Sequence, residues 1–183
     1  MNARIHPRPA VFVDRDGTLI KEVRHLSSVD DMEIFPFTAT AVDLLKNSGY
    51  LVIVVTNQSG IGREYFDESS MHSIHNRLQT ELGGQIDGFY FCPHLPAAGC
   101  KCRKPGIGMI ESACADFRID LQRSWIIGDK SIDVETGHNA GIRTALVLTG
   151  YGHDHKLLLE QESDLIEEHF LDVAYKIIRS EQG

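Results

Sequence analysis

Residues 10–18 read Ala-Val-Phe-Val-Asp-Arg-Asp-Gly-Thr, an apolar run that ends in two carboxylates, Asp14 and Asp16. The run 10–13 is short, apolar and half β-branched, which is typical of an interior strand of a parallel sheet. Side chains two positions apart in extended chain point the same way, so Asp14 and Asp16 can converge on one ligand while Arg15 turns aside. Two carboxylates this close repel each other, and Mg²⁺, which binds oxygen and leaves positions for a phosphate, is the usual neutraliser. The alternative is a strand followed by an ordinary polar turn.

The whole chain, residues 1–183, has the size and composition of a single globular domain. It is 42% hydrophobic and 24% charged, which is enough to bury a full core. Its net charge of −8 disfavours nucleic acid and anionic membranes as partners, because both need a basic surface. The N-terminal segment has no apolar signal core and no run reaches the length of a membrane span, so we expect a cytoplasmic protein. A monomer is the default expectation.

Strand-like and helix-like segments alternate along the chain. This alternation predicts an α/β fold with a doubly wound, Rossmann-like parallel sheet, whose ligands bind beyond the carboxyl ends of the strands. The predicted strands are 10–14, 51–55, 86–91, 124–127 and 143–148, and the predicted helices are 37–48, 68–82, 107–117 and 131–139. An edge strand at 164–166 and a tail helix with apolar positions from Ile166 to Ile178 follow, and the helix is expected to pack on the sheet.

Polar residues follow the second and fourth predicted strands. Thr56 and Asn57 open a Gly-rich segment that can cradle an anion, although the same residue types occur in any loop. After the fourth strand, Asp129 can complete an acidic metal site and Lys130 can meet a phosphate. As an alternative, Asp129 caps the helix that follows it.

The segment after the third predicted strand carries four soft metal ligands within eleven residues: Cys92, His94, Cys100 and Cys102. This spacing indicates a closed tetrahedral Zn²⁺ site, and four protein ligands with no position for water argue for a structural metal. A disulfide is less expected in a cytoplasmic chain, and accidental clustering is the remaining alternative. The fourth cysteine, Cys114, falls on a predicted helix and is expected to be a small core residue.

Two basic residues, Arg103 and Lys104, come directly after the zinc ligands. A loop rich in Pro and Gly has little apolar surface with which to order itself, so bound zinc would position this pair. Lys104 precedes Pro105, which biases its backbone towards an extended conformation. The alternative is a pair of solvated surface charges.

Four segments in this order, DRDGT, TNQSG, RKP and GDK, resemble the signature motifs of the haloacid dehalogenase (HAD) superfamily of phosphatases. The CPH and CKC pairs before RKP resemble its zinc-containing branch, which holds heptose bisphosphate phosphatases and histidinol-phosphatases. The resemblance runs from about residue 10 to residue 150. It implies that Asp14 is the nucleophile that forms an aspartyl-phosphate, and that Asp16 protonates the leaving oxygen and then activates water. It also implies Mg²⁺ bound by the Asp14 carboxylate, the Asp16 backbone carbonyl and the Asp129 carboxylate.

The same resemblance implies contacts to the phosphoryl group and the substrate. Thr56 and Lys104 would stabilise the transferring phosphoryl group and Asn57 would help to place it. Arg103 and Lys130 would contact substrate. About thirty residues separate Thr18 from the second strand, which leaves no room for a large cap domain. The segment 20–28 is then the expected substrate-facing loop.

The implied function is Mg²⁺-dependent removal of the 7-phosphate of D-glycero-D-manno-heptose 1,7-bisphosphate, in heptose synthesis for lipopolysaccharide or S-layer. The segment TNQSGIGREYF resembles the heptose enzymes more than the TNQDG of histidinol-phosphatases. Histidinol-phosphate phosphatase is the alternative with the same chemistry. A non-catalytic module that binds phosphate or nucleic-acid ends is the alternative of another class, and the acidic composition opposes it. The anomer and the oligomeric state stay open.

Two histidine pairs lie outside these motifs. His72 and His75 are one helical turn apart, and His153 and His155 flank an aspartate. Histidine pairs without further ligands nearby are more often solvated than ligating, so we expect both pairs to face solvent.

Overall fold

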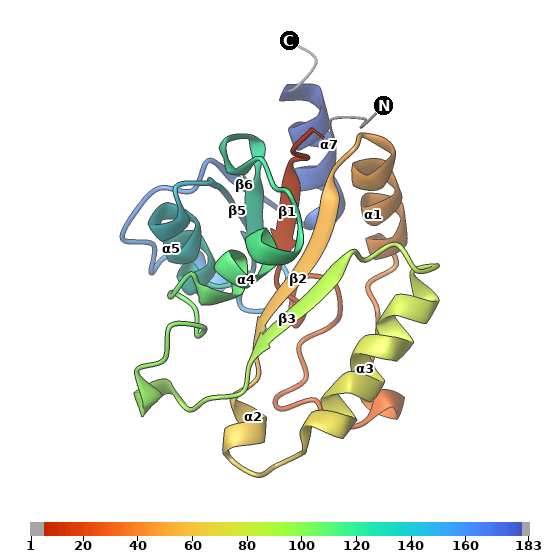
Figure 1. The fold of residues 1–183 in the computed structure, drawn as a ribbon, viewed down its shortest axis with the longest axis vertical. Helices are drawn as coiled ribbons and strands as arrows, with labels where there is room; N and C mark the ends of the chain where they lie inside the picture. Colours follow the sequence, from red (N-terminus) through yellow and green to blue (C-terminus); the bar gives the residue numbers. More distant parts are fainter. Residues whose placement is uncertain (1–5, 181–183) are drawn as a thin grey trace.

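The computed structural model describes residues 6–180. Six parallel strands form a single sheet in the order β3-β2-β1-β4-β5-β6 (Figure 1). The strand order reverses between β1 and β4, the position at which doubly wound sheets bind their ligands. The strands are β1 (Ala10–Val13), β2 (Leu51–Asn57), β3 (Gly88–Cys92), β4 (Trp125–Gly128), β5 (Arg143–Val147) and β6 (Leu165–Glu167). The α/β, doubly wound prediction is confirmed.

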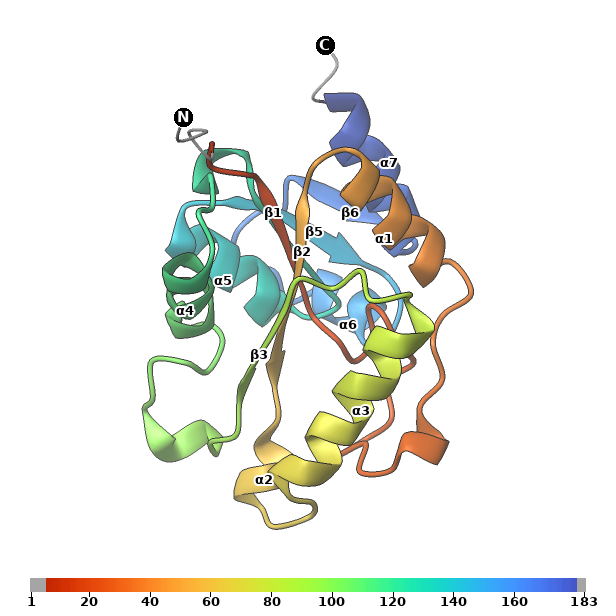
Figure 2. The same ribbon diagram turned by 45° about the vertical axis from the view of Figure 1, so that its right-hand side comes forward.

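Helices cover both faces of this sheet (Figure 2). Side chains of β1 alternate between the faces, so Val11 and Val13 pack with α1, α3 and α7, whereas Ala10 and Phe12 pack with α4. All four residues of β1 are fully buried, as expected for the centre of a parallel sheet. The helices are α1 (Thr38–Asn47), α2 (Ser59–Gly62), α3 (Glu68–Glu81), α4 (Gly108–Asp116), α5 (Ser131–Ala140), α6 (Gly152–Lys156) and α7 (Phe170–Ser180).

The carboxyl ends of the central strands lie along one edge of the sheet, and three connecting segments lie next to that edge. The chain after β1, the short helix α2 and the loop after β3 all gather beyond this edge, in the lower part of Figure 1. Residues that follow β1, β2, β3 and β4 are therefore brought within reach of one another. This is the physical basis of the expectation that polar residues at strand ends form one site.

The second strand is longer than its sequence predicted. Thr56 and Asn57 belong to β2, because they pair in register with Phe91 and Cys92 of β3. These two polar residues are therefore held by sheet hydrogen bonds and do not belong to a loop. The short helices α2 and α6 were not predicted, since neither is long enough to show a helical period.

The C-terminal part of the described chain closes one face of the sheet. Strand β6 lies at the edge, one residue later than predicted, and α7 buries an apolar stripe against the sheet. The stripe consists of Phe170, Val173, Ala174 and Ile177. The predicted packing of the tail helix is confirmed. Within residues 6–180 we find no helix whose length and apolarity would suit a membrane crossing.

Candidate active site

Three aspartates meet where β1 and β4 end. Asp14 follows β1, Asp129 follows β4, and Asp133 lies in the first turn of α5. One carboxylate oxygen from each lies within 4.8 Å of the other two. All three side chains are buried, with 5% or less of each residue exposed. Three oxygen donors in a buried cluster suit a hard divalent cation such as Mg²⁺.

Lys104 enters this cluster from the segment that follows the zinc ligands. Its Nζ lies 3.0 Å from Asp14 Oδ1 and 2.5 Å from Asp133 Oδ1, and it donates to the carbonyl of Val55 at 3.0 Å. Asn57 fixes the backbone behind this ammonium: its Nδ2 donates to the Lys104 carbonyl at 3.2 Å and its Oδ1 accepts the Lys104 N–H at 3.0 Å. The Asn57 side chain thus supports Lys104 from behind. The Lys104–Pro105 peptide bond is cis.

The pKa shifts reflect the crowding of charge. Burial opposes ionisation of Asp14, but Lys104 and Lys130 overcome it and hold its pKa below the usual value. Burial raises the pKa of Asp129 to about 7, against the attraction of Lys130. Burial also raises the pKa of Asp133, and Lys104 opposes this shift. A divalent cation would allow all three carboxylates to ionise together, which is why this donor set fits a metal.

Two glycines make room for the carboxylates. A Cβ on Gly17 would lie 2.2 Å from Asp129 Oδ2, and the φ of Gly17, +84°, is left-handed. A Cβ on Gly128 would lie 2.1 Å from Asp133 Oδ2. Both positions therefore exclude any side chain, and each of the two carboxylates packs directly against the backbone of a glycine.

Asp16 has different partners from Asp14. The guanidinium of Arg15 holds both of its carboxylate oxygens, at distances between 2.9 and 3.2 Å. Gln58 Nε2 donates to Asp16 Oδ2 and to Thr56 Oγ1, both at 2.8 Å. The side chain of Asp16 therefore stands apart from the three-aspartate cluster and faces the cleft.

A cleft of about 250 Å³ opens over these residues. Asp14, Asp16 and Lys104 lie in its wall, and the loop after β1 supplies a further side from Glu22 to Leu26. The predicted substrate-facing loop, 20–28, does line this cleft. The remaining lining residues that carry charge or a ring are Arg103, Lys130 and Tyr151.

The Lys130 side chain lies in the wall of the cleft, between the carboxylates of Glu22 and Asp129. Its Nζ lies 3.2 Å from Glu22 Oε2 and 3.3 Å from Asp129 Oδ1, and 4.9 Å from the centre of the Tyr151 ring. Burial disfavours its charge, but Asp14, Asp129 and Glu22 raise the pKa of Lys130. The ammonium is therefore charged and able to meet an anion in the cleft.

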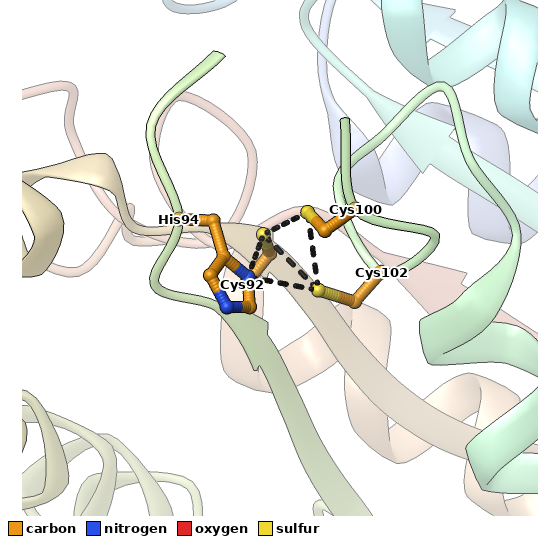
Figure 3. A group of neighbouring side chains, drawn as sticks. All are labelled: Cys92, His94, Cys100 and Cys102. Atoms are coloured by element: carbon orange, nitrogen blue, oxygen red, sulfur yellow. Dashed lines mark hydrogen bonds between the residues drawn. The ribbon is translucent and has the colours of Figure 1, made fainter. Parts of the chain in front are cut away.

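The four predicted soft ligands converge after β3 (Figure 3). Neighbouring donor atoms, which are three sulfurs and Nδ1 of His94, lie between 3.3 and 3.6 Å apart. Zinc at about 2.3 Å from each sulfur would place sulfurs about 3.8 Å apart, close to this spacing. The donor set and its geometry fit a closed Zn²⁺ site formed by Cys92, His94, Cys100 and Cys102. Arg103 Nη1 donates to the His94 carbonyl at 3.3 Å, which ties the basic pair to the cluster.

Comparison with known proteins gives concordant matches. A family model described as HAD-hyrolase-like matches residues 101–173. A probable D-glycero-D-manno-heptose-1,7-bisphosphate 7-phosphatase of Thermoplasma acidophilum is 42% identical over 75% of this chain and 88% of its own length. D-glycero-beta-D-manno-heptose-1,7-bisphosphate 7-phosphatase of Neisseria meningitidis is 39% identical over 87% of this chain and 86% of its own. The chain belongs to the HAD superfamily of hydrolases, in its heptose bisphosphate phosphatase branch.

A solved structure of a HAD phosphatase is similar to this chain in three dimensions. The D,D-heptose 1,7-bisphosphate phosphatase from B. bronchiseptica, complexed with magnesium and phosphate, superposes with a TM-score of 0.87. It is 28% identical to this chain, and the match covers 94% of this chain and 99% of the other. The HAD resemblance of the four sequence motifs is thereby confirmed.

The HAD motifs predicted most of the side chains that meet here. Asp14, Thr56, Lys104, Asp129 and Lys130 all border one site. Sequence reasoning left Asp133 without a role, although its place one turn after Asp129 is visible in the sequence. Its carboxylate also accepts the Lys130 N–H at 3.1 Å, as the N3 residue of a capping box.

Gln58 and Arg15 were likewise given no role, and both contact Asp16. A signal for Gln58 is its position directly after the polar end of β2. No pattern in the sequence distinguishes Arg15 from an ordinary exposed arginine, because its burial is a property of the folded chain.

The prediction for the histidine pairs is wrong for His75. It is 3% exposed and stacks on Phe89 at 4.6 Å between ring centres, whereas His72 is exposed. His155 is half-buried, and its Nδ1 accepts the Ser131 N–H at 3.1 Å at the start of α5. Cys114 is half-buried against the core on the α4 face, as expected for a small packing residue.

Proposed function

We propose that this chain is a Mg²⁺-dependent phosphatase that removes the 7-phosphate of D-glycero-D-manno-heptose 1,7-bisphosphate through an aspartyl-phosphate. The observation that carries this proposal is Asp14. It is buried, Lys104 and Lys130 hold its pKa below the usual value, its Oδ1 is paired with Lys104 Nζ at 3.0 Å, and it faces a cleft that holds a second acid, Asp16. The names of the curated relatives and the magnesium and phosphate of the B. bronchiseptica complex support the substrate and the metal.

In the first step, Asp14 attacks phosphorus. Arg15 N–H and Lys104 Nζ both bind Asp14 Oδ1, so Oδ2 is the oxygen that forms the new O–P bond. The bond between phosphorus and the sugar oxygen breaks, and Asp16 gives its proton to that oxygen. Lys104 stabilises the charge that develops on the phosphoryl oxygens, together with the Thr56 hydroxyl.

In the second step, water attacks the phosphorus of the aspartyl-phosphate. Asp16, now ionised, takes the proton from that water, and the bond between Asp14 and phosphorus breaks. Inorganic phosphate leaves and Asp14 returns as a carboxylate. Asp16 thus exchanges protons with the leaving group and then with water, Asp14 forms and then loses a bond to phosphorus, and the chain ends the cycle unchanged.

We propose that Mg²⁺ is held by carboxylates of Asp14, Asp129 and Asp133 and by the Asp16 backbone carbonyl. When bound, the metal would neutralise phosphoryl charge and orient the phosphate for in-line attack. The raised pKa of Asp129, about 7, supports this assignment, because Lys130 does not fully compensate the burial of this carboxylate and a divalent cation would.

We propose that Zn²⁺ at the four-ligand cluster has a structural role. Cys102, Arg103 and Lys104 are consecutive, so fixing the cysteine fixes the backbone that presents both cations. Arg103 and Lys130 would contact the phosphorylated sugar, with Asn57 holding Lys104 in place. The cleft is formed by short loops, so we propose a small substrate that is held mainly by its phosphate end.

We propose that the whole chain acts as a single-domain monomer in the cytoplasm. Its net charge of −8 supports a small phosphorylated molecule over nucleic acid as the partner, because the basic residues at the site are few and local.

A phosphate-release assay tests the proposal. The purified chain with Mg²⁺ is compared on the α and β anomers of D-glycero-D-manno-heptose 1,7-bisphosphate and on histidinol phosphate. We expect one or both heptose compounds to have the higher kcat/KM, with release of the 7-phosphate only. A higher kcat/KM on histidinol phosphate would replace the first function by the second. Hydrolysis unaffected by EDTA would refute the magnesium-dependent mechanism.

A further inference from the structure

Arg15 is an unusual residue for the interior. It is 1% exposed and is one of the largest fully buried side chains of the described chain. It lies two residues after the buried strand β1, between the two catalytic acids in sequence. A buried guanidinium is stable only when an anion and good hydrogen bonds compensate its lost hydration. The group that pairs with Arg15 therefore indicates what the guanidinium does in the fold.

That partner is Asp16, held by both sides of the guanidinium fork. Arg15 Nε donates to Oδ2 at 3.2 Å, and Nη2 donates to Oδ1 at 3.1 Å and to Oδ2 at 2.9 Å. Gln58 Nε2 adds a further donor to Oδ2 at 2.8 Å. Oδ2 accepts three of these hydrogen bonds and Oδ1 accepts one, and a bidentate pair with a guanidinium is the contact that a carboxylate makes best.

A buried histidine, His75, lies close enough to feel the charge of the guanidinium. Arg15 Nη1 and His75 Nε2 are both buried and, within residues 6–180, neither has a hydrogen-bond partner. Burial and then the charge of Arg15 lower the pKa of His75 to about 3, so the imidazole is uncharged at neutral pH. His75 therefore adds no charge that competes with Arg15 for Asp16.

The two half-reactions need Asp16 in different forms. It is a proton donor when the aspartyl-phosphate forms and an ionised acceptor when water attacks. We propose that Arg15 is a positioning residue for the second half: it holds the ionised Asp16 where the carboxylate can accept a proton from the attacking water. This inference rests on the proposed phosphatase function. Arg15 therefore contributes more to the rate at which the aspartyl-phosphate breaks down than to the rate at which it forms.

The test separates the two half-reactions of the purified, zinc-loaded chain with Mg²⁺. Heptose 1,7-bisphosphate labelled at the 7-phosphate is mixed with enzyme, and labelled protein is quenched in acid over time. An excess of unlabelled substrate then gives the decay rate of the labelled protein. In Arg15→Met we expect decay to slow by about 10²-fold, the scale of a misplaced acid or base, and formation to slow at least tenfold less. Labelled protein should then accumulate in the steady state.

Two further variants control for charge and for general damage. Arg15→Lys keeps the positive charge but cannot bind two oxygens at once, so its decay rate should fall between wild type and Arg15→Met. Arg77→Met removes an exposed arginine of α3 that pairs with Glu81, and it should leave both rates unchanged. Because Lys tolerates burial next to a carboxylate, Arg15→Lys also serves if Arg15→Met does not fold.

A second measurement asks whether Arg15 acts through Asp16. The decay rate of Arg15→Met/Asp16→Asn should match that of Asp16→Asn alone, because Arg15 has no carboxylate left to hold. Equal slowing of formation and decay in Arg15→Met, wild-type decay in Arg15→Lys, or additive effects in the double variant would each overturn the inference. Absence of labelled protein in the wild type would instead overturn the proposed function itself.

Discussion

Asp14 and Asp16 are two residues apart and have separate partners, and this separation is what gives one short segment two chemical roles. Asp14 meets an ammonium, Lys104, inside a cluster of carboxylates, whereas Asp16 meets a guanidinium and an amide at the cleft. An acid in a cluster with a cation is suited to nucleophilic attack, and one that borders the cleft is suited to proton transfer.

The first prediction concerns the nucleophile. Asp14→Asn should reduce phosphate release to below about 10⁻³ of wild type, because a neutral amide is a poor nucleophile for phosphorus. The amide keeps the shape of the side chain and can still accept from Lys104, so the melting temperature and zinc content should stay close to wild type. The measurement is steady-state phosphate release with thermal unfolding as the control. Substantial activity in a folded variant would show that another residue attacks.

The second prediction concerns the buried His75. Its pKa is about 3 in the folded chain and about 6.5 when unfolded, so the unfolded state binds an extra proton between these values. The free energy of unfolding should therefore fall as the pH drops below 6.5, and at pH 5 this histidine accounts for about 2 kcal/mol of the loss.

Denaturant unfolding between pH 7.5 and 5 measures this effect. His75→Phe should show a weaker loss of stability than wild type over this range. His72→Phe, on the exposed side of the same helix, should follow wild type. Parallel stability curves for wild type and His75→Phe would contradict the assignment of a buried neutral imidazole.

At the scale of elements, the segment after β3 connects metal binding to catalysis. The four ligands enclose a loop, and the next two residues carry the cations of the site. The loop side chains from Leu95 to Gly99 are exposed or half-exposed, so apolar packing contributes little to their order. Metal binding is the interaction that can compensate the lost chain entropy here.

The third prediction follows from this arrangement. Cys100→Ser should lose bound zinc, become sensitive to proteolysis between residues 93 and 101, and lose about tenfold or more in kcat/KM through displacement of Lys104. Cys114→Ser lies outside the cluster and should retain zinc and activity. Zinc per chain, measured by metal analysis of both variants, decides the matter. A full zinc content in Cys100→Ser would remove this residue from the ligand set.

At the scale of the whole molecule, the reversal of strand order between β1 and β4 is what gathers the site. The carboxylates come from β1 and from the β4 to α5 turn, and the ammonium comes from the loop after β3. Two distant parts of the chain thus supply the carboxylates for a cation, and a third supplies the ammonium beside them. These parts lie close together only in the folded state. A metal that binds the carboxylates therefore stabilises the folded state relative to the unfolded chain.

The fourth prediction is the size of that effect. At a Mg²⁺ concentration 100 times the dissociation constant, the free energy of unfolding should rise by about 2.7 kcal/mol. Thermal unfolding with and without Mg²⁺ gives the shift, and EDTA should abolish both the shift and phosphate release. In Asp129→Asn the shift should shrink or vanish while zinc stays bound. An equal Mg²⁺ shift in that variant would place the metal elsewhere.

The fold class and most of the reactive groups follow from the amino-acid sequence alone. Runs of β-branched residues alternate with amphipathic segments, and this alternation predicts a parallel sheet covered by helices. The apolar residues of each run are buried when the run is a strand, and those of each amphipathic segment are buried when the segment is a helix. The ligand spacing of Cys92 to Cys102 and the acids after β1 and β4 are local in the chain, and so they can be read without coordinates.

The partner of each reactive group, in contrast, depends on how the chain folds in three dimensions. Arg15 and His75 are both buried in the fold, and the register of β2 with β3 holds Asn57 where its side chain bonds the backbone of Lys104. The turn into α5 brings Asp133 to Lys104 at 2.5 Å. The two contacts of Lys104 join residues 47 and 29 positions apart, and burial and charge pairing are properties of that arrangement in space.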